Sequence, residues 1–210
     1  MEEDTNSKVR TWSYIVLTSI GVYVLINVLL AFLRPDYSLV HNAESDYGRG
    51  PYSWVMDIAF LLRCAFSLLL IKALWTTFPK DTGIRKASYW MVISAVASGL
   101  LAFFADTPYG YTHVWTTPVH SFLAVAVFFG LIIGMALLNK RFLTIPSWRK
   151  TAALLTCITV LAVISLVLMK STGGFSPHGA GGLFERIFLV LTLIWQGIVA
   201  VKMISMKKPL

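Results

Sequence analysis

The chain has 210 residues, of which 57% are apolar and only 13% are charged. A soluble domain usually has a charged fraction of about a quarter, so this composition, with a mean hydropathy of +0.71, excludes an ordinary soluble domain. The formal net charge of +8 would suit a nucleic-acid partner. However, the basic residues gather in short segments between apolar runs, which is typical of a membrane protein and leaves no need for nucleic acid.

Apolar runs of about 20 residues, the length of a membrane-spanning helix, recur along the chain. Their connections are short, so residues 1–210 are predicted to form a single polytopic membrane domain of the all-α class, a six-helix transmembrane bundle. The first run ends without a small-residue cleavage site, so we interpret it as a retained span and not as a signal peptide. The six predicted spans are about 12–33, 54–78, 87–106, 117–138, 150–169 and 183–205.

The distribution of Lys and Arg predicts how these spans are oriented. The segments that precede span one, join spans two and three, join spans four and five, and follow span six carry 12 Lys and Arg residues, whereas the opposite loops carry only Arg34, Arg49 and Lys170. Cytoplasmic segments of membrane proteins are enriched in Lys and Arg. We therefore expect a multi-pass protein of the cell membrane with both termini in the cytoplasm and the lipid bilayer as its surroundings.

The connection between the first two spans carries the densest group of polar residues. It runs from His41 to Trp54 and contains Ser45, Asp46 and the tract Gly48-Arg49-Gly50-Pro51. Glycine permits a positive φ, and proline disfavours helix in the residue before it, so this tract is expected to turn sharply.

Two ionisable residues lie inside the second span. Asp57 is one turn below its start, and Arg63 lies about 13 Å along it, close to the midplane of a hydrocarbon core about 30 Å thick. An arginine at that depth must find partners in the bundle interior or in water. Because the two residues point about 120° apart, Arg63 is expected to pair across helices or to bind a substrate anion. The structural alternative is a buried ion pair that locks the bundle.

Small residues predict where helices approach closely. In the fourth span Ala126, Gly130 and Gly134 recur at four-residue spacing, a pattern typical of tight helix packing in membranes. In the third span Ser94 and Ser98 share one face. Asp106 is expected on that same face, at the outer end of the helix.

Many of the titratable residues gather on the side of the membrane opposite to the basic segments. All four histidines lie in those loops or at the adjoining helix ends, and we assign His113 no role beyond its loop. These residues predict a polar cavity that opens to the outer face and has Arg63 at its floor. The expected catalytic residues are His41, Asp46, His120, His178 and Glu185. The expected substrate-binding residues are Ser45, Asp57, Arg63, Asp106 and Gln196.

Three kinds of chemistry suit such a cavity, and the sequence leaves them open. In one, a general base, His120 or His178, activates Ser45 or Ser121 as a nucleophile. In another, a protonated carboxyl group delivers a proton to a lipid or isoprenoid. In the third, a catalytic zinc ion takes ligands from His41, His120, His178 and Asp46. The non-catalytic alternative is a lipid or small-molecule binder, a transporter or a helper subunit of a membrane complex.

Three short motifs together resemble a known family. They are Ser45-Asp46-Tyr47-Gly48 followed by Gly50-Pro51-Tyr52-Ser53-Trp54-Val55-Met56, then His120-Ser121, and then Gly182-Leu183-Phe184-Glu185-Arg186. The family is a bacterial and archaeal one, catalogued as a domain of unknown function, number 998, and the resemblance covers almost the whole chain. It implies six spans and lipid-facing biology but no particular reaction. The Ser45-Asp46 tract is also similar to multi-pass proteins that include GPI-anchor remodelling factors and autophagy modulators.

Overall fold

A computed structural model of the chain describes residues 2–107 and 115–206, so that His113 lies outside the described residues. Within them the chain forms six long α-helices and two short 3-10 helices, with no β-strand, which confirms the all-α prediction. In chain order these elements are α1 (Glu2–Leu33), η1 (Glu44–Gly48), α2 (Ser53–Thr77), α3 (Thr82–Leu101), α4 (Thr117–Phe142), η2 (Pro146–Trp148), α5 (Arg149–Ser171) and α6 (Gly181–Ile204).

The first helix begins ten residues before its expected span, and the third is displaced from its span at both ends. It runs over Thr82–Leu101, whereas the apolar run predicted 87–106. The reason at its start is a side-chain cap: Asp81 accepts a hydrogen bond from the backbone N–H of Ile84 at 3.0 Å, which starts the helix inside the basic segment. Asp106 therefore lies beyond the helix and not on its outer turn, as a correction to the sequence-based expectation.

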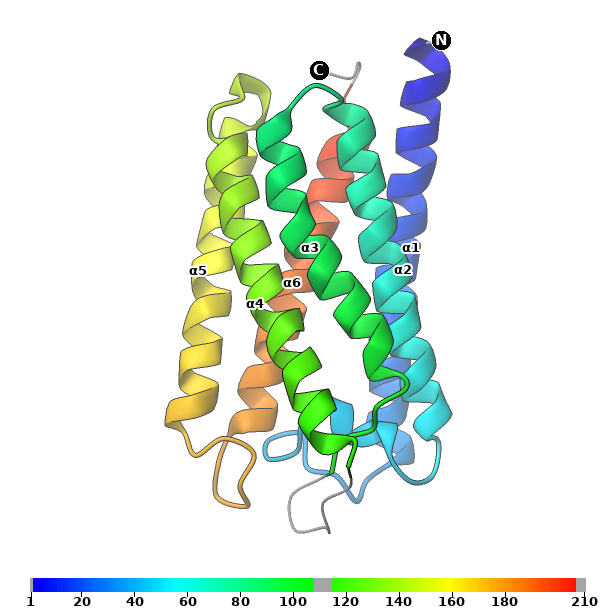
Figure 1. Ribbon diagram of the computed structural model, residues 1–210, viewed down its shortest axis with the longest axis vertical. Helices are drawn as coiled ribbons and strands as arrows, with labels where there is room; N and C mark the ends of the chain where they lie inside the picture. The colour runs from blue at the N-terminus through cyan, green and yellow to red at the C-terminus, as the bar shows by residue number, and fades with distance from the viewer. Residues whose placement is uncertain (1, 108–114, 207–210) are drawn as a thin grey trace.

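Consecutive long helices run antiparallel, and the start of α1 and the end of α6 lie at the same end of the bundle (Figure 1). We call this end the terminal end and the opposite end, which carries η1 and the longest loops, the distal end. Helix α6 packs against α1, α2 and α5, and α3 packs between α2 and α4.

The helices have the length and surface of membrane-spanning segments. Among the described residues, five helices (α1, α2, α4, α5 and α6) are long and apolar enough to cross a membrane. Helix α3 is less apolar than these five helices because Arg85 and Lys86 lie close to its first turn. Helix α3 nevertheless runs between the same two ends of the bundle as α2 and α4 (Figure 1) and packs against both of them. The protein is a multi-pass membrane protein.

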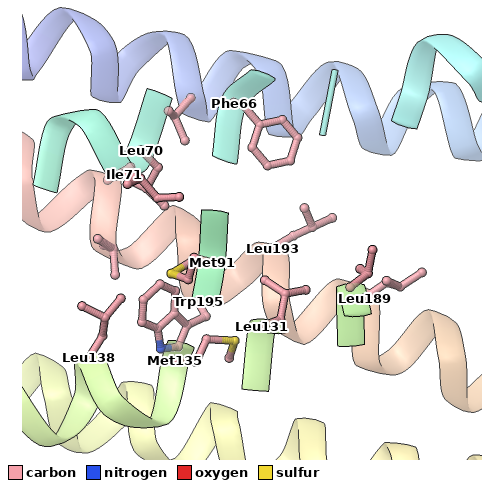
Figure 2. Close-up of a cluster of buried hydrophobic side chains, with 14 of the residues drawn as sticks. Phe66, Leu70, Ile71, Met91, Leu131, Met135, Leu138, Leu189, Leu193 and Trp195 are labelled. Atoms are coloured by element: carbon pink, nitrogen blue, oxygen red, sulfur yellow. The ribbon is translucent and has the colours of Figure 1, made fainter. Parts of the chain in front are cut away.

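Large apolar side chains cover the outside of the bundle and also fill its interior. Leu25 and Phe122 are exposed, as expected of residues that face lipid. Inside, Trp195 is fully buried and packs among Met91, Met135 and other side chains from several helices (Figure 2). Because lipid is as apolar as these side chains, van der Waals packing and hydrogen bonds hold the helices together.

Helices α3 and α4 approach most closely where glycine faces α3. A Cβ atom at Gly130 would lie 2.8 Å from the carbonyl oxygen of Trp90, and one at Gly134 would lie 2.5 Å from Cγ of Met91. The hydroxyl of Ser94 also donates a hydrogen bond to the carbonyl oxygen of Val127 at 2.9 Å. The expectation that the small residues of the fourth span permit close packing is confirmed.

Candidate functional site at the distal end

The loop between α1 and α2 is fixed by an arginine at its start. Arg34 is 5% exposed, forms an ion pair with Asp36 at 2.8 Å, and donates hydrogen bonds to the carbonyl oxygens of Arg49 and Pro51. Gly50 has a φ of +71° where the chain turns beside Arg34, which confirms the predicted sharp turn. The loop is thereby folded back across the distal end of the bundle.

The first turn of α6 holds the middle of the same loop. A Cβ atom at Gly182 would lie 2.1 Å from the carbonyl oxygen of Asn42, so glycine is required for this contact. One turn further along α6, Arg186 donates to the carbonyl oxygens of Asn42 and Leu39 at 2.7 and 3.0 Å. These contacts place η1 directly over the start of α6.

Two buried acidic residues, Glu44 and Glu185, lie next to each other where η1 lies over α6. Glu44 and Glu185 are each 6% exposed. The backbone N–H of Glu44 donates to Oε2 of Glu185 at 2.7 Å, while the side chain of Glu44 accepts a hydrogen bond from the hydroxyl of Tyr23. The two acids are 141 residues apart in the sequence, so tertiary structure alone brings them together.

A buried guanidinium lies below this pair. Arg63 is 4% exposed and donates to the hydroxyl of Tyr23 at 3.3 Å and to that of Thr192 at 3.2 Å. Arg63 therefore forms hydrogen bonds across helices, because Tyr23 belongs to α1 and Thr192 to α6, but both of these partners are neutral. Tyr23 accepts from Arg63 and donates to Glu44, and so joins the positive group to the negative one.

These side chains surround a cavity of about 30 Å³ to which α1, η1, α2, α3, α4 and α6 all contribute. A cavity needs roughly 10–15 Å³ to hold one water molecule, so this one holds one or two. Its apolar walls include Met56, Phe60 and Leu101. We call it the distal chamber, and its polar lining consists of Tyr23, Glu44, Ser45, Arg63, Ser98, His120 and Glu185.

His120 lines the distal chamber from α4 and is 3% exposed. Its Nδ1 lies 2.7 Å from the carbonyl oxygen of Phe104. A carbonyl oxygen can only accept, so Nδ1 carries a proton and donates a hydrogen bond to Phe104. Nε2 lies 3.8 Å from a carboxylate oxygen of Asp106, in the loop that follows α3, and this contact attracts only when Nε2 carries a proton as well.

Gln196 lies one turn below Thr192 on α6 and does not line the distal chamber. Its Oε1 accepts a hydrogen bond from the hydroxyl of Ser67 at 3.4 Å. The pair forms a second polar layer beneath Arg63, because Ser67 follows Arg63 by one turn of α2.

Several of the residues expected at the site lie elsewhere. His178 and Ser121 are exposed, and Nδ1 of His41 lies 2.5 Å from the carbonyl oxygen of Gly179, where it ties two distal loops together. Asp57 is half-buried on α2 and is not part of the chamber lining.

Asp46 is buried in η1 but turns into its own loop. Its Oδ2 accepts hydrogen bonds from the side chain of Asn42 at 2.9 Å and from the backbone N–H of Ala43 at 3.1 Å. Burial raises the pKa of this carboxyl group, and the hydrogen bonds offset the effect only in part. Asp46 therefore stabilises the fold of its own loop, which covers the distal chamber.

The residues considered as zinc ligands are not assembled into a metal site. Across residues 2–107 and 115–206, no three His, Cys, Asp or Glu side chains are placed so that they could hold a metal ion together. Of the four candidates, only His120 lines the distal chamber, and the other three are His41, His178 and Asp46.

Sequence reasoning passed over three side chains that the structure places at the centre of the site, namely Glu44, Tyr23 and Thr192. Glu44 immediately precedes the Ser45-Asp46 tract, but nothing local distinguishes it from a solvated loop acid. Tyr23 gave a usable signal, because a hydroxyl-bearing residue in the interior of an apolar span needs a partner.

Comparison with known proteins identifies a family over most of the chain. The model of a family described as "Protein of unknown function (DUF998)" matches residues 17–202. No curated protein and no solved structure matches the chain. The similarity of the Ser45-Asp46 tract to GPI-anchor remodelling factors and autophagy modulators therefore stays an expectation from the sequence.

Proposed function

Because the chain belongs to the DUF998 family, whose function is unknown, we propose a role from its own residues: a membrane enzyme that performs acid–base chemistry on a lipid or other amphiphile. The observation that carries this proposal is that two buried acidic residues, Glu44 and Glu185, line one chamber. Paired carboxyl groups divide the roles of general acid and general base in several classes of enzyme.

The surrounding residues suggest the other roles. Within residues 2–107 and 115–206, Arg63 donates hydrogen bonds to the neutral hydroxyls of Tyr23 and Thr192 and forms no ion pair with a carboxylate. Its charge is therefore available to bind an anionic or strongly polar group of the substrate. His120 also faces the chamber, and an imidazole can accept or return a proton.

An amphiphile is the substrate class that suits the position of the distal chamber. The chamber lies among the ends of membrane-spanning helices, and apolar side chains such as Met56, Phe60 and Leu101 form much of its wall. A molecule that resides in the bilayer can present its polar group to such a site while its chains stay in lipid. With both termini in the cytoplasm, as the distribution of Lys and Arg predicts, the site would serve the outer leaflet.

The test is untargeted lipidomics of cells that express the wild-type chain, no chain, Glu185→Gln, or Asp57→Asn as a matched control. Asp57 is an acid near the same end that does not line the chamber. We expect the wild type and Asp57→Asn to change the abundance of the same lipid class. Cells that express Glu185→Gln should have the same lipid profile as cells that do not express the chain. If Glu185→Gln, expressed at the wild-type level, changes lipids as the wild type does, the proposal is wrong.

A second candidate, a non-catalytic lipid or small-molecule binder, is favoured by one observation. The main polar groups of the chamber already bond to one another, so they can hold a ligand's polar group at the chamber without taking part in proton transfer. In that case the purified wild-type chain would retain a bound amphiphile, and the lipid profile of the cells would not change.

A further inference from the structure

A second cavity lies between α4 and α5, in the half of the bundle nearer the terminal end. Its volume is about 420 Å³, within the range of 300–1,000 Å³ that is usual for ligand sites. Of the sequence-adjacent helix pairs, α4 and α5 are the least extensively packed against each other. Ile132 and Ala136 of α4 face Val160 and Val163 of α5 across it. We call this cavity the α4–α5 groove.

The uncharged polar side chains in the groove are already satisfied by protein. Nδ2 of Asn139 donates to the hydroxyl of Thr159 at 2.8 Å, and Oδ1 of Asn139 accepts from the indole N–H of Trp195 at 2.9 Å. The hydroxyl of Thr159 donates in turn to the carbonyl oxygen of Leu155 at 2.9 Å. The groove therefore offers its occupant apolar walls, and a polar solute would gain no hydrogen bond to replace those it makes to water.

An exposed lysine lies at one end of the groove. Lys140 lines it, and among the described residues no carboxylate forms an ion pair with Lys140. The next residue, Arg141, is held by Asp81 at 2.8 Å. Arg149 and Lys150 begin α5 at the same end of the bundle and are also exposed, so the mouth of the groove is positively charged.

The dimensions favour an acyl chain over a helix. From Lys140 to Ile132 the groove extends roughly 12 Å, at 1.5 Å per residue. A helix 10–12 Å in diameter would need on the order of 1,000 Å³ over that length, more than twice the volume of the groove. An acyl chain fits an apolar channel of this size, and an anionic headgroup complements the basic mouth.

We propose that the α4–α5 groove binds one acyl chain of an anionic phospholipid whose phosphate lies against Lys140. Basic pockets between membrane helices are known to hold anionic headgroups in this way. The inference is independent of the proposed function, because no residue of the groove lines the distal chamber.

The test for the headgroup is native mass spectrometry of the full chain in detergent, titrated with phosphatidylglycerol or with phosphatidylcholine of the same acyl chains. We expect phosphatidylglycerol to bind more tightly, and Lys140→Gln to weaken its binding about fivefold, as loss of one cation near a lipid surface predicts, without affecting phosphatidylcholine. The matched control is Lys86→Gln, an exposed lysine near the same end that does not line the groove, and it should bind as the wild type.

The test for the acyl chain uses Val160→Trp, which fills the groove, against Val167→Trp on a lipid-facing part of the same helix. We expect Val160→Trp to lose the bound lipid and Val167→Trp to keep it. Equal affinity for the two lipids, or an equal loss in Lys86→Gln and Lys140→Gln, would overturn the proposal. So would dimers of the wild-type chain that dissociate in Val160→Trp, since a second copy would then occupy the groove. If Val160→Trp does not fold, the lysine variants still decide.

Discussion

Tyr23 is the residue that connects the charged groups of the distal chamber. It is 2% exposed on α1, donates to Glu44 and accepts from Arg63. Without its hydroxyl, Glu44 would lose a donor and Arg63 an acceptor, both in a buried place where a lost hydrogen bond costs about 1–3 kcal/mol. This one phenol group therefore holds α1, η1 and α2 in register.

We expect Tyr23→Phe to lower the free energy of unfolding by about 1–3 kcal/mol, measured by denaturant titration in detergent micelles. The matched control is Tyr14→Phe, because Tyr14 lies on the same helix and is 53% exposed. The control should unfold as the wild type. An equal stability of the two variants would show that the hydroxyl of Tyr23 does not bridge the charges.

Two aspartates of the distal loop should give opposite pH dependences. Burial raises the pKa of Asp46, so the folded state binds the proton more tightly, and stability falls as the pH rises above the unfolded value of about 3.9. Asp36 accepts hydrogen bonds from Arg34, and these bonds lower the pKa of the Asp36 carboxyl group. The contribution of Asp36 to the stability of the folded state is therefore present above about pH 3.9 and is lost as the pH falls through the lowered pKa.

The measurement is thermal unfolding from about pH 3 to 7 for the wild type, Asp46→Asn and Asp36→Asn. Relative to Asp46→Asn, the wild type should lose stability with rising pH. Relative to Asp36→Asn, it should lose stability with falling pH. Parallel curves for all three proteins would contradict the assigned environments of both carboxyl groups.

At the scale of elements, the contact between α3 and α4 depends on two glycines. We expect Gly130→Ala and Gly134→Ala each to lower the free energy of unfolding by about 1–3 kcal/mol, because the added methyl group would overlap Trp90 or Met91 and force the helices apart. Gly21→Ala is the control, since a Cβ atom there meets nothing within 4 Å. It should be neutral or slightly stabilising in a helix, as unfolding in micelles would show.

The elements themselves were largely predictable, because length and apolar content are local properties of a chain. The ends of α3 were not, since an aspartate cap at Asp81 outweighed the onset of the apolar run. The close packing at Gly130 and Gly134 was also predictable, because their four-residue spacing alone puts them on one helix face.

The site was only partly predictable. Arg63, His120, Glu185 and Ser45 were expected in a cavity and do line one. Helix periodicity says which residues share a helix face, but it cannot say how a long loop folds over a bundle. Helix periodicity therefore did not identify Glu44 as a chamber residue. It also could not show that His41 joins two loops or that His178 is exposed.

At the scale of the whole molecule, the orientation in the membrane can be measured directly. In a chain whose Cys64 and Cys157 are replaced by serine, we expect a membrane-impermeant thiol reagent to label His178→Cys in intact cells and not Lys86→Cys. His178 lies at the distal end and Lys86 near the terminal end, and the basic segments should face the cytoplasm. Labelling of Lys86→Cys alone would reverse the orientation and place the distal chamber toward the inner leaflet.

Glu44 and Glu185 line one chamber and join a loop to a helix that lies 141 residues further along the chain. The most direct test is a double-mutant cycle on the free energy of unfolding with Glu44→Gln, Glu185→Gln and the double variant, with Asp57→Asn and Glu185→Gln as the control pair. We predict a coupling energy of about 0.5–3 kcal/mol for the two glutamates and additivity within about 0.5 kcal/mol for the control pair. Additive effects of Glu44→Gln and Glu185→Gln would contradict the contact between the two residues.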